Sequence, residues 1–241
     1  MGKLNKLGRT LFAVSMAAFG IQYLIYALFK AGPGLGPPWT PVHPFWGYVT
    51  AIVSLGAAAA SIATNIRVRC AAIVLAITIL LRVLLAYVPK LAANPHDPGP
   101  WTSGSELLAM CGVALVLAAG YKTITVGRFL FAIPLLVFGI QHFQYARFIA
   151  TLEPSWIPGH LFWAYFVGVA FFAAAFSIAT QIRAGLSATW LGIMFLLWVL
   201  GLHLPRVAAA PHNGNEWTSA FVALAMSGGA FLVAGSSKQA Y

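Results

Sequence analysis

The chain has 241 residues, of which 61% are hydrophobic and 7% are charged. A soluble domain has about 25% charged residues, so this composition excludes an ordinary soluble globular protein and also a disordered chain. The formal net charge is +10, but the lysines and arginines stand at the ends of apolar runs, where they orient membrane helices rather than bind nucleic acid.

The apolar runs predict an all-α, polytopic membrane protein. A helix needs about 20 apolar residues to cross the hydrocarbon core of a bilayer, and eight segments are close to that length. The fourth segment, which Glu106 interrupts, and the eighth, which contains Gly228 and Gly229, are the weakest. In chain order the predicted transmembrane helices are Thr10–Phe29, His43–Thr64, Cys70–Val88, Trp101–Gly120, Phe129–Phe148, His160–Thr180, Leu186–Leu204 and Trp217–Ala234.

The distribution of charge predicts how the chain is oriented. Nine basic residues lie on one side of the predicted spans and four on the other, with Arg82 inside a span. The positive-inside rule then predicts a multi-pass protein of the cell (inner) membrane with both termini in the cytoplasm. The basic stretch Met1–Arg9 resembles a signal peptide, but no cleavage site follows it, so we expect a retained helix. The outer side receives at least five of the six histidines and all the acidic residues, Asp97, Glu106, Glu153 and Glu216.

The two halves of the chain repeat each other. Four motifs of the first half recur in the second half in the same order. We therefore expect two four-helix repeats, residues 1–122 and 123–241. Because each has an even number of spans, the repeats would be parallel and related by a pseudo-twofold axis along the membrane normal. The matched segments are Gly20–Tyr26 with Gly139–Tyr145, His43–Tyr48 with His160–Tyr165, Ser61–Arg67 with Ser177–Arg183, and Pro95–Ser103 with Pro211–Ser219.

Two charged residues fall inside predicted spans, where each needs a structural or functional reason. Arg82 lies in the third span and Glu106 in the fourth, at a similar depth. The matched positions of the second half are Trp198 and Val222, so both charges are lost together. We expect an intramembrane Arg82–Glu106 ion pair that acts as a structural staple rather than a proton relay. The alternative for Glu106 is a capping box over the Ser103–Glu106 stretch.

Four histidines occupy matched positions at the predicted outer surface, each near a tryptophan. Neutral imidazole binds metals and haem iron and forms hydrogen bonds with quinone carbonyls, so this set is a candidate ligand-binding site. The alternative is interfacial, because His, Trp and Tyr are typical of the aromatic belt at the headgroup level. The residues are His43, His96, His160 and His212, with Trp46, Trp101, Trp163 and Trp217.

The second repeat has two further histidines, His142 in place of Tyr23 and His203 in place of Tyr87. Loss of symmetry between repeats predicts that a single working site lies in the second half. Both histidines are therefore added to the candidate ligand-binding set. No HxxxH or CxxC spacing is present, so no metal site is predicted.

The remaining polar side chains of the spans do not indicate classical catalysis. Gln22 and Gln141 are matched amides in the first and fifth spans, and each can hold either a polar group of a ligand or a neighbouring helix. No phosphate-binding glycine loop and no Ser-His-Asp arrangement occurs, so no catalytic residue is assigned. Cys70 and Cys111 lie in or beside apolar runs, which argues against a disulfide.

These motifs give the repeat unit a resemblance to the DoxX-like membrane proteins, four-helix bacterial proteins named after a subunit of an archaeal thiosulfate:quinone oxidoreductase. The features that carry the resemblance recur in both halves. They are Gly20-Ile21-Gln22 in the first span, the His-x-Phe-Trp start of the next, and the Pro95-His96 and Trp101-Thr102-Ser103 segment before the fourth. The resemblance implies a membrane partner of redox enzymes, sometimes linked to quinone or to thiol and sulfur chemistry. No cysteine pair is present to relay electrons through a disulfide.

The leading hypothesis is a membrane subunit or partner of a quinone-linked redox complex. Its His/Trp site at the outer face would bind a quinone or dock a redox partner protein. One alternative is a scaffold or assembly protein whose outer loops recruit a partner. The other is a small-solute transporter, in which Arg82, Glu106 and the two glutamines would line the path. The sequence gives neither the substrate nor a cofactor beyond this suggestion of quinone.

Overall fold

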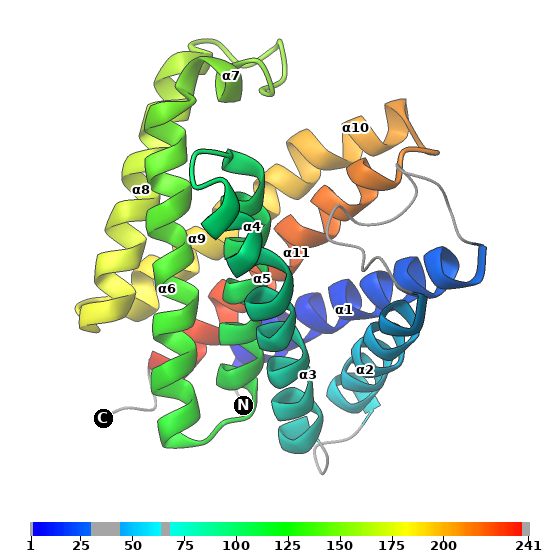
Figure 1. Ribbon diagram of the computed structural model, residues 1–241. Coiled ribbons are helices and arrows are strands. Elements are labelled where there is room, and N and C mark those ends of the chain that lie inside the picture. Colours follow the sequence, from blue (N-terminus) through cyan, green and yellow to red (C-terminus); the bar gives the residue numbers. More distant parts are fainter. Residues whose placement is uncertain (1, 30–43, 64–67, 238–241) are drawn as a thin grey trace.

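The computed structural model describes residues 2–29, 44–63 and 68–237, and this part of the chain is all helical (Figure 1). Two π-helical segments, η1 (Val83–Tyr87) and η2 (Val199–His203), join α3 to α4 and α9 to α10 without a break. The α-helices are α1 (Lys3–Phe29), α2 (Pro44–Ala63), α3 (Val68–Arg82), α4 (Val88–Ala93), α5 (Pro98–Leu117), α6 (Tyr121–Gln144), α7 (Ala146–Ala150), α8 (His160–Thr180), α9 (Ala184–Trp198), α10 (Leu204–Ala209) and α11 (Gly214–Ser237).

Seven helical stretches within the described residues are long and apolar enough to cross a membrane, which makes the chain a multi-pass membrane protein. The second predicted span corresponds to α2, whose described apolar portion is Gly47–Ala57 and is shorter than a full crossing. The count of eight therefore stays a prediction. The seven stretches are Lys3–Ile25, Val68–Ala93, Pro98–Leu117, Tyr121–Gln144, His160–Thr180, Ala184–Ala209 and Gly214–Ser237.

The two spans that looked weakest in the sequence lie at the centre of the bundle. The structure buries 78% of the apolar stretch of α11 and 56% of that of α5, against 28% for the stretch that contains α3. α5 and α11 also contact each other. Helices that face protein rather than lipid can carry small and polar residues, which explains their lower hydropathy.

Glycine pairs allow the central helices to cross closely. α1 packs against α2 and α11, and α6 packs against α8 and α5. A Cβ atom on Gly112 of α5 would lie 2.5 Å from the carbonyl oxygen of Gly127 in α6. A Cβ atom on Gly228 of α11 would lie 2.7 Å from the carbonyl oxygen of Gly8 in α1. At both crossings, glycines at matched sequence positions allow the two helix backbones to approach closely.

Each π-helical segment is explained by the proline that follows it. Pro205 has no N–H group and cannot continue the regular α-helical hydrogen bonding. The preceding residue, Leu204, donates its N–H to the carbonyl of Val199, five residues back, and this widens the turn. η1 has the same arrangement before Pro89. η2 ends at His203, so the widened turn determines where that imidazole lies.

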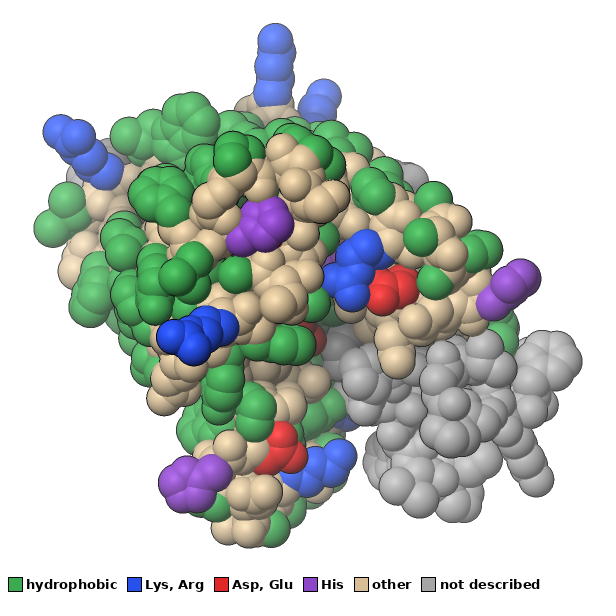
Figure 2. Space-filling model, turned by 90° about the horizontal axis from the view of Figure 1, so that it is seen from above, with side chains coloured by type: hydrophobic (Ala, Val, Ile, Leu, Met, Phe, Trp, Pro, Cys, Tyr) green, Lys and Arg blue, Asp and Glu red, His purple; other side chains and the backbone are tan. Residues whose placement is uncertain are grey.

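The two ends of the bundle differ in composition. α1 begins and α11 ends toward the bottom of Figure 1, whereas α7 and α10 lie toward the top. The upper end, called the α7 end below, contains the turns before α5 and α11 and the segment between α7 and α8. Figure 2 views this end and shows histidine, acidic and basic side chains among the hydrophobic ones. The ion pair of this end joins Arg206 Nε to Glu216 Oε2 at 3.1 Å.

Candidate functional site

A cavity of about 680 Å³ lies inside the bundle, between α5, α6, α7, α8, α9, η2 and α11. It extends from Pro98 and Gly99, where α5 begins at the α7 end, to Met226 in the middle of α11. Most of the wall is apolar. The polar side chains that line it are Thr102, Ser103, Glu106, Gln141, His142, His203, Thr218 and Ser219.

An aromatic cluster forms one wall of the cavity. The ring centroids of Phe195 and Trp198 lie 5.4 Å apart with an interplanar angle of 84°, and those of Phe171 and Trp198 lie 6.0 Å apart at 80°. Phe138 packs on Phe171 from the next helix at 5.7 Å. Edge-to-face pairs of this kind hold rings in fixed orientations, so the wall offers flat, ordered aromatic surfaces.

His142 is built into this wall. Its ring stacks with Trp198 at a centroid distance of 6.5 Å and an interplanar angle of 11°. Its Nδ1 lies 2.8 Å from the carbonyl oxygen of Phe138, one helical turn back. A carbonyl can only accept, so Nδ1 carries the proton and donates. In the neutral ring, Nε2 is then the acceptor atom, and the backbone of α6 determines the tautomer.

His203 contributes the second imidazole of the lining. It is the last residue of η2, and its Nδ1 is a buried polar atom with no hydrogen-bond partner among the described residues. Buried polar atoms without a partner are rare and costly, and they occur where a ligand or water completes the hydrogen bond. The Arg206–Glu216 pair follows one turn later, and it fixes the start of α11 next to the cavity.

Glu106 lines the cavity from α5, whereas Arg82 of α3 lines a different, smaller pocket. The guanidinium of Arg82 is 5.0 Å from the ring centroid of Tyr23, and its Nη1 is 3.5 Å from Thr50 Oγ1. Leu107, the neighbour of Glu106, faces Arg82 instead. Successive residues of an α-helix point about 100° apart, so the two charges face different compartments. The structure does not bring Arg82 and Glu106 into an ion pair.

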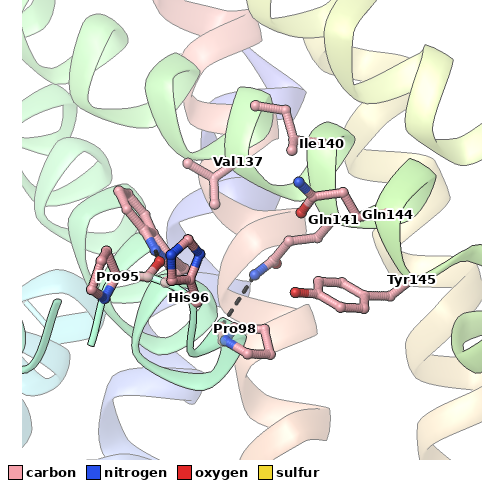
Figure 3. Close-up of a pocket in the computed structure, with 9 residues that line it drawn as sticks. Pro95, His96, Pro98, Val137, Ile140, Gln141, Gln144 and Tyr145 are labelled. Carbon is pink, nitrogen blue, oxygen red and sulfur yellow. Dashed lines mark hydrogen bonds between the residues drawn. The ribbon is translucent and has the colours of Figure 1, made fainter.

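A smaller pocket of about 250 Å³ lies beside the cavity at the α7 end (Figure 3). It is lined by His96 and Trp101 of the α4–α5 region, by Gln144 at the end of α6 and by Tyr145, which follows α6. Gln141 lines both the pocket and the cavity. Figure 3 shows its side chain extended toward Pro98, whose carbonyl oxygen accepts a hydrogen bond from Gln141 Nε2 at 3.2 Å. Gln141 therefore separates an outer pocket from the intramembrane cavity.

The matched glutamines each contact a threonine of a neighbouring helix. Gln141 Oε1 lies 3.0 Å from Thr102 Oγ1, and Gln22 Nε2 donates to Thr218 Oγ1 at 3.2 Å. Both contacts join the first helix of one half to the last helix of the other. Both amides therefore contact a neighbouring helix, as the helix-packing interpretation expects. Of the two glutamines, Gln141 also lines the cavity.

The tryptophans of the predicted His/Trp set close turns. The indole N–H of Trp101 donates to the Pro95 carbonyl at 2.8 Å, and that of Trp217 donates to the Pro211 carbonyl at 2.9 Å. Trp163 donates in the same way at the start of α8, to the Pro158 carbonyl at 3.1 Å. The recurring Pro-His and Trp-Thr-Ser motif is therefore explained by turn geometry.

The predicted histidines separate into two groups. His142 and His203 line the cavity, whereas His96, His160 and His212 do not. His212 is exposed in the turn before α11. His160 begins α8 next to Glu153, where burial raises the pKa of the Glu153 carboxyl and the neighbouring imidazole lowers it. His43 and the side chain of Trp46, also in the predicted set, lie outside the described residues.

The first half of the chain has a matched but nearly closed pocket of about 30 Å³. Its lining includes Tyr23, Arg82 and Leu107, and these positions correspond to His142, Trp198 and Ala223 in the large cavity. The guanidinium over Tyr23 takes the place of the His142–Trp198 stack. The small pocket and the large cavity therefore use several residues at matched sequence positions, although α5 of the first half also lines the large cavity.

Sequence reasoning missed most of the cavity wall. Phe138, Phe171 and Phe195 gave no signal, since phenylalanine is common in lipid-facing helices as well. Trp198 does give a signal, because it stands at the position that matches Arg82. In the sequence, this difference indicates only the loss of a charge. Glu106 gives a signal as a charge within a span, but the sequence pairs it with Arg82, and the structure shows no ion pair between them.

No family model, curated protein or solved structure matches this chain. Among the described residues, no group of three or more His, Cys, Asp and Glu side chains is placed to hold a metal ion. Any function must therefore be argued from the cavity and its lining.

Proposed function

We propose that this chain is a quinone-binding membrane subunit, or membrane partner, of a redox complex, and that the quinone ring occupies the cavity. The observation that carries the proposal is the cavity itself, about 680 Å³ inside a membrane bundle with an aromatic wall and a few converging polar groups. Ligand pockets typically have volumes of roughly 300–1,000 Å³ and a lining of this kind.

The lining supplies both kinds of hydrogen-bonding group that a quinone needs. The Nε2 acceptor of His142 suits a hydroxyl of the reduced form, and the hydroxyls of Ser103 and Ser219 suit a carbonyl of the oxidised form. Oxidation of a quinol releases two electrons and two protons. In this proposal the electrons pass to a redox partner protein docked at the α7 end, and the two protons are released to solvent.

Binding of a quinone analogue to the purified protein in mild detergent tests this proposal. We expect decylubiquinone or a menaquinone analogue to bind with one site per chain. His142→Phe keeps a ring in the wall and removes the acceptor atom, and an unsatisfied hydrogen bond costs about 1–3 kcal/mol, so its affinity should fall roughly tenfold to hundredfold. His212→Phe is the control, because that side chain is exposed and outside the cavity.

Two results would remove the support for a quinone site. One is a wild-type protein that binds no quinone analogue and carries none when it is purified from native membranes. The other is an equal loss of affinity in His142→Phe and His212→Phe. Either result would favour the scaffold or transporter hypotheses.

The proposal places the chain in the inner membrane as eight spans in two parallel four-helix repeats, residues 1–122 and 123–241. The matched contacts of the two halves support it: the glycine crossings, the Gln–Thr contacts and the indole-closed turns. A further matched pair joins the third and fourth helices of each half. Cys111 Sγ contacts the Ala76 carbonyl at 3.3 Å, and Ser227 Oγ donates to the Gly192 carbonyl at 2.8 Å.

In this proposal both termini are cytoplasmic, and the native cysteines allow a direct test. Cys70 is exposed near the start of its span, and Cys111 is buried. We expect a membrane-impermeant maleimide to label Cys70 in permeabilised cells and to leave it unlabelled in intact ones. In a Cys70→Ser background, His212→Cys should label in intact cells. The opposite labelling pattern would show that both termini lie outside the cell membrane and that the proposed orientation is wrong.

A further inference from the structure

Arg82 is a charge near the middle of the 26-residue apolar stretch Val68–Ala93. A guanidinium stays protonated in proteins, and a charged group inside a bilayer needs a partner that compensates its charge. The face of Tyr23, 5.0 Å from the guanidinium carbon, attracts a cation but carries no net charge. Arg82 therefore still requires a negative charge.

The chain supplies no carboxylate to Arg82. The sequence has four acidic side chains, and all four belong to residues that the structure describes. Glu216 pairs with Arg206, and the Asp97 carboxylate accepts from the Gly99 N–H at 2.9 Å. Glu106 lines the large cavity, and Glu153 lies between α7 and α8. None of the four forms an ion pair with Arg82.

A small pocket lies directly beside the guanidinium. Its volume is about 30 Å³, which is enough for a group of about the size of a water molecule. Besides apolar side chains, it is lined by Tyr23 and by the hydroxyl-bearing residues Thr50, Ser54 and Thr78. Thr50 Oγ1 is 3.5 Å from Arg82 Nη1. The Thr78 hydroxyl donates to the Val74 carbonyl at 2.9 Å. The guanidinium and the Ser54 and Thr50 side chains around a space of this size are suited to a small anion.

We propose that this pocket is a binding site for a single monatomic anion, chloride under physiological conditions, held by Arg82. The small volume favours a halide over the larger phosphate and sulfate ions. The anion compensates the half-buried charge that the four acidic side chains leave unpaired. This site is distinct from the quinone cavity, since Leu107 lines the small pocket and Glu106 lines the large cavity.

Thermal unfolding of the purified full chain in chloride and in gluconate at equal ionic strength tests the proposal. A ligand that binds only the folded state raises the melting temperature with its concentration. At a chloride concentration about a hundred times its Kd, we expect a rise of roughly 5–10 °C. Arg82→Met keeps an unbranched side chain of similar length and removes the charge, so it should lose this response. Arg147→Gln, which changes an exposed arginine at the α7 end, should keep it.

A second measurement does not depend on the folding of a variant. Crystals of the wild-type protein grown in bromide should show an anomalous peak beside the Arg82 guanidinium. Absence of that peak would overturn the proposal, and so would a wild-type melting temperature that is the same in chloride and gluconate. A chloride response that persists in Arg82→Met, or an equal response to sulfate, would show a general salt effect instead of this site.

Discussion

Replacing Ala223 with tryptophan is expected to abolish quinone binding while leaving the bundle folded. Ala223 lines the cavity from α11, and an indole at this position would occupy much of the space that a ring needs. A ligand in such a site must bury most of its surface, so we expect affinity to fall by at least about a hundredfold. The first half of the chain gives the precedent: Leu107 stands at the matched position, and the pocket there has only about 30 Å³.

Titration of the purified variant with the quinone analogue measures this effect, and Ala223→Leu should give an intermediate loss. Val169→Trp is the matched control, because that side chain of α8 is 55% exposed on the surface of the bundle. Both tryptophan variants should keep the melting temperature of the wild type within a few degrees. If Ala223→Trp binds the analogue as well as Val169→Trp does, the ligand lies elsewhere and the cavity has another role.

Much of the fold could be predicted from the sequence, because an apolar run of sufficient length has few alternatives to a membrane helix. The predicted third and seventh spans correspond to helical stretches that continue further, to Ala93 and Ala209. The reason is that Pro89 and Pro205 do not end these helices. π-helical turns before them keep the chain helical.

The rotation of each helix about its axis could not be predicted. A helix that is apolar on every side has no hydrophobic period from which to tell its protein-facing side. Glu106 shows the consequence. Its predicted depth is similar to that of Arg82, and both charges are absent from the matched positions of the second half, so the sequence suggests a pair. The side of α5 that it occupies depends on packing against α6 and α11, which the sequence does not display.

The site was predictable where the two halves differ. His142 and His203 were singled out because tyrosines stand at the matched positions, and both line the cavity. The histidines and tryptophans common to both halves were the weaker guide. Trp101 and Trp217 both close equivalent turns through their indole N–H groups. The repeated motif therefore indicates a shared turn structure and not a ligand site.

The glycine crossings lead to the largest expected effect on stability. Gly112→Ala would place a Cβ atom 2.5 Å from the Gly127 carbonyl oxygen and 2.7 Å from the Phe131 amide nitrogen. Neither contact can be relieved by rotating a side chain, because both are to backbone atoms. Overpacking typically costs about 1–3 kcal/mol, and we expect a loss of unfolding free energy at or above the upper end of this range.

Gly228→Ala should cost a similar amount, since its Cβ would lie 2.6 Å from the Phe12 amide nitrogen at the matched crossing. Unfolding in mixed micelles by titration with a denaturing detergent measures both variants. Gly56→Ala is the control, because a Cβ there has no neighbour within 4 Å, and alanine is the better helix former by about 1 kcal/mol. It should unfold at the same detergent fraction as the wild type, or later.

The double variant Gly112→Ala, Gly228→Ala tests whether the halves are equivalent. The two crossings involve different helix pairs, α5 with α6 and α1 with α11, so their costs should add if the crossings are independent. Equal and additive losses are what two copies of one unit would give. A Gly112→Ala protein as stable as Gly56→Ala would mean that α5 and α6 do not approach so closely. A large loss of unfolding free energy at one crossing alone would mean that the other crossing does not depend on its glycine in the same way.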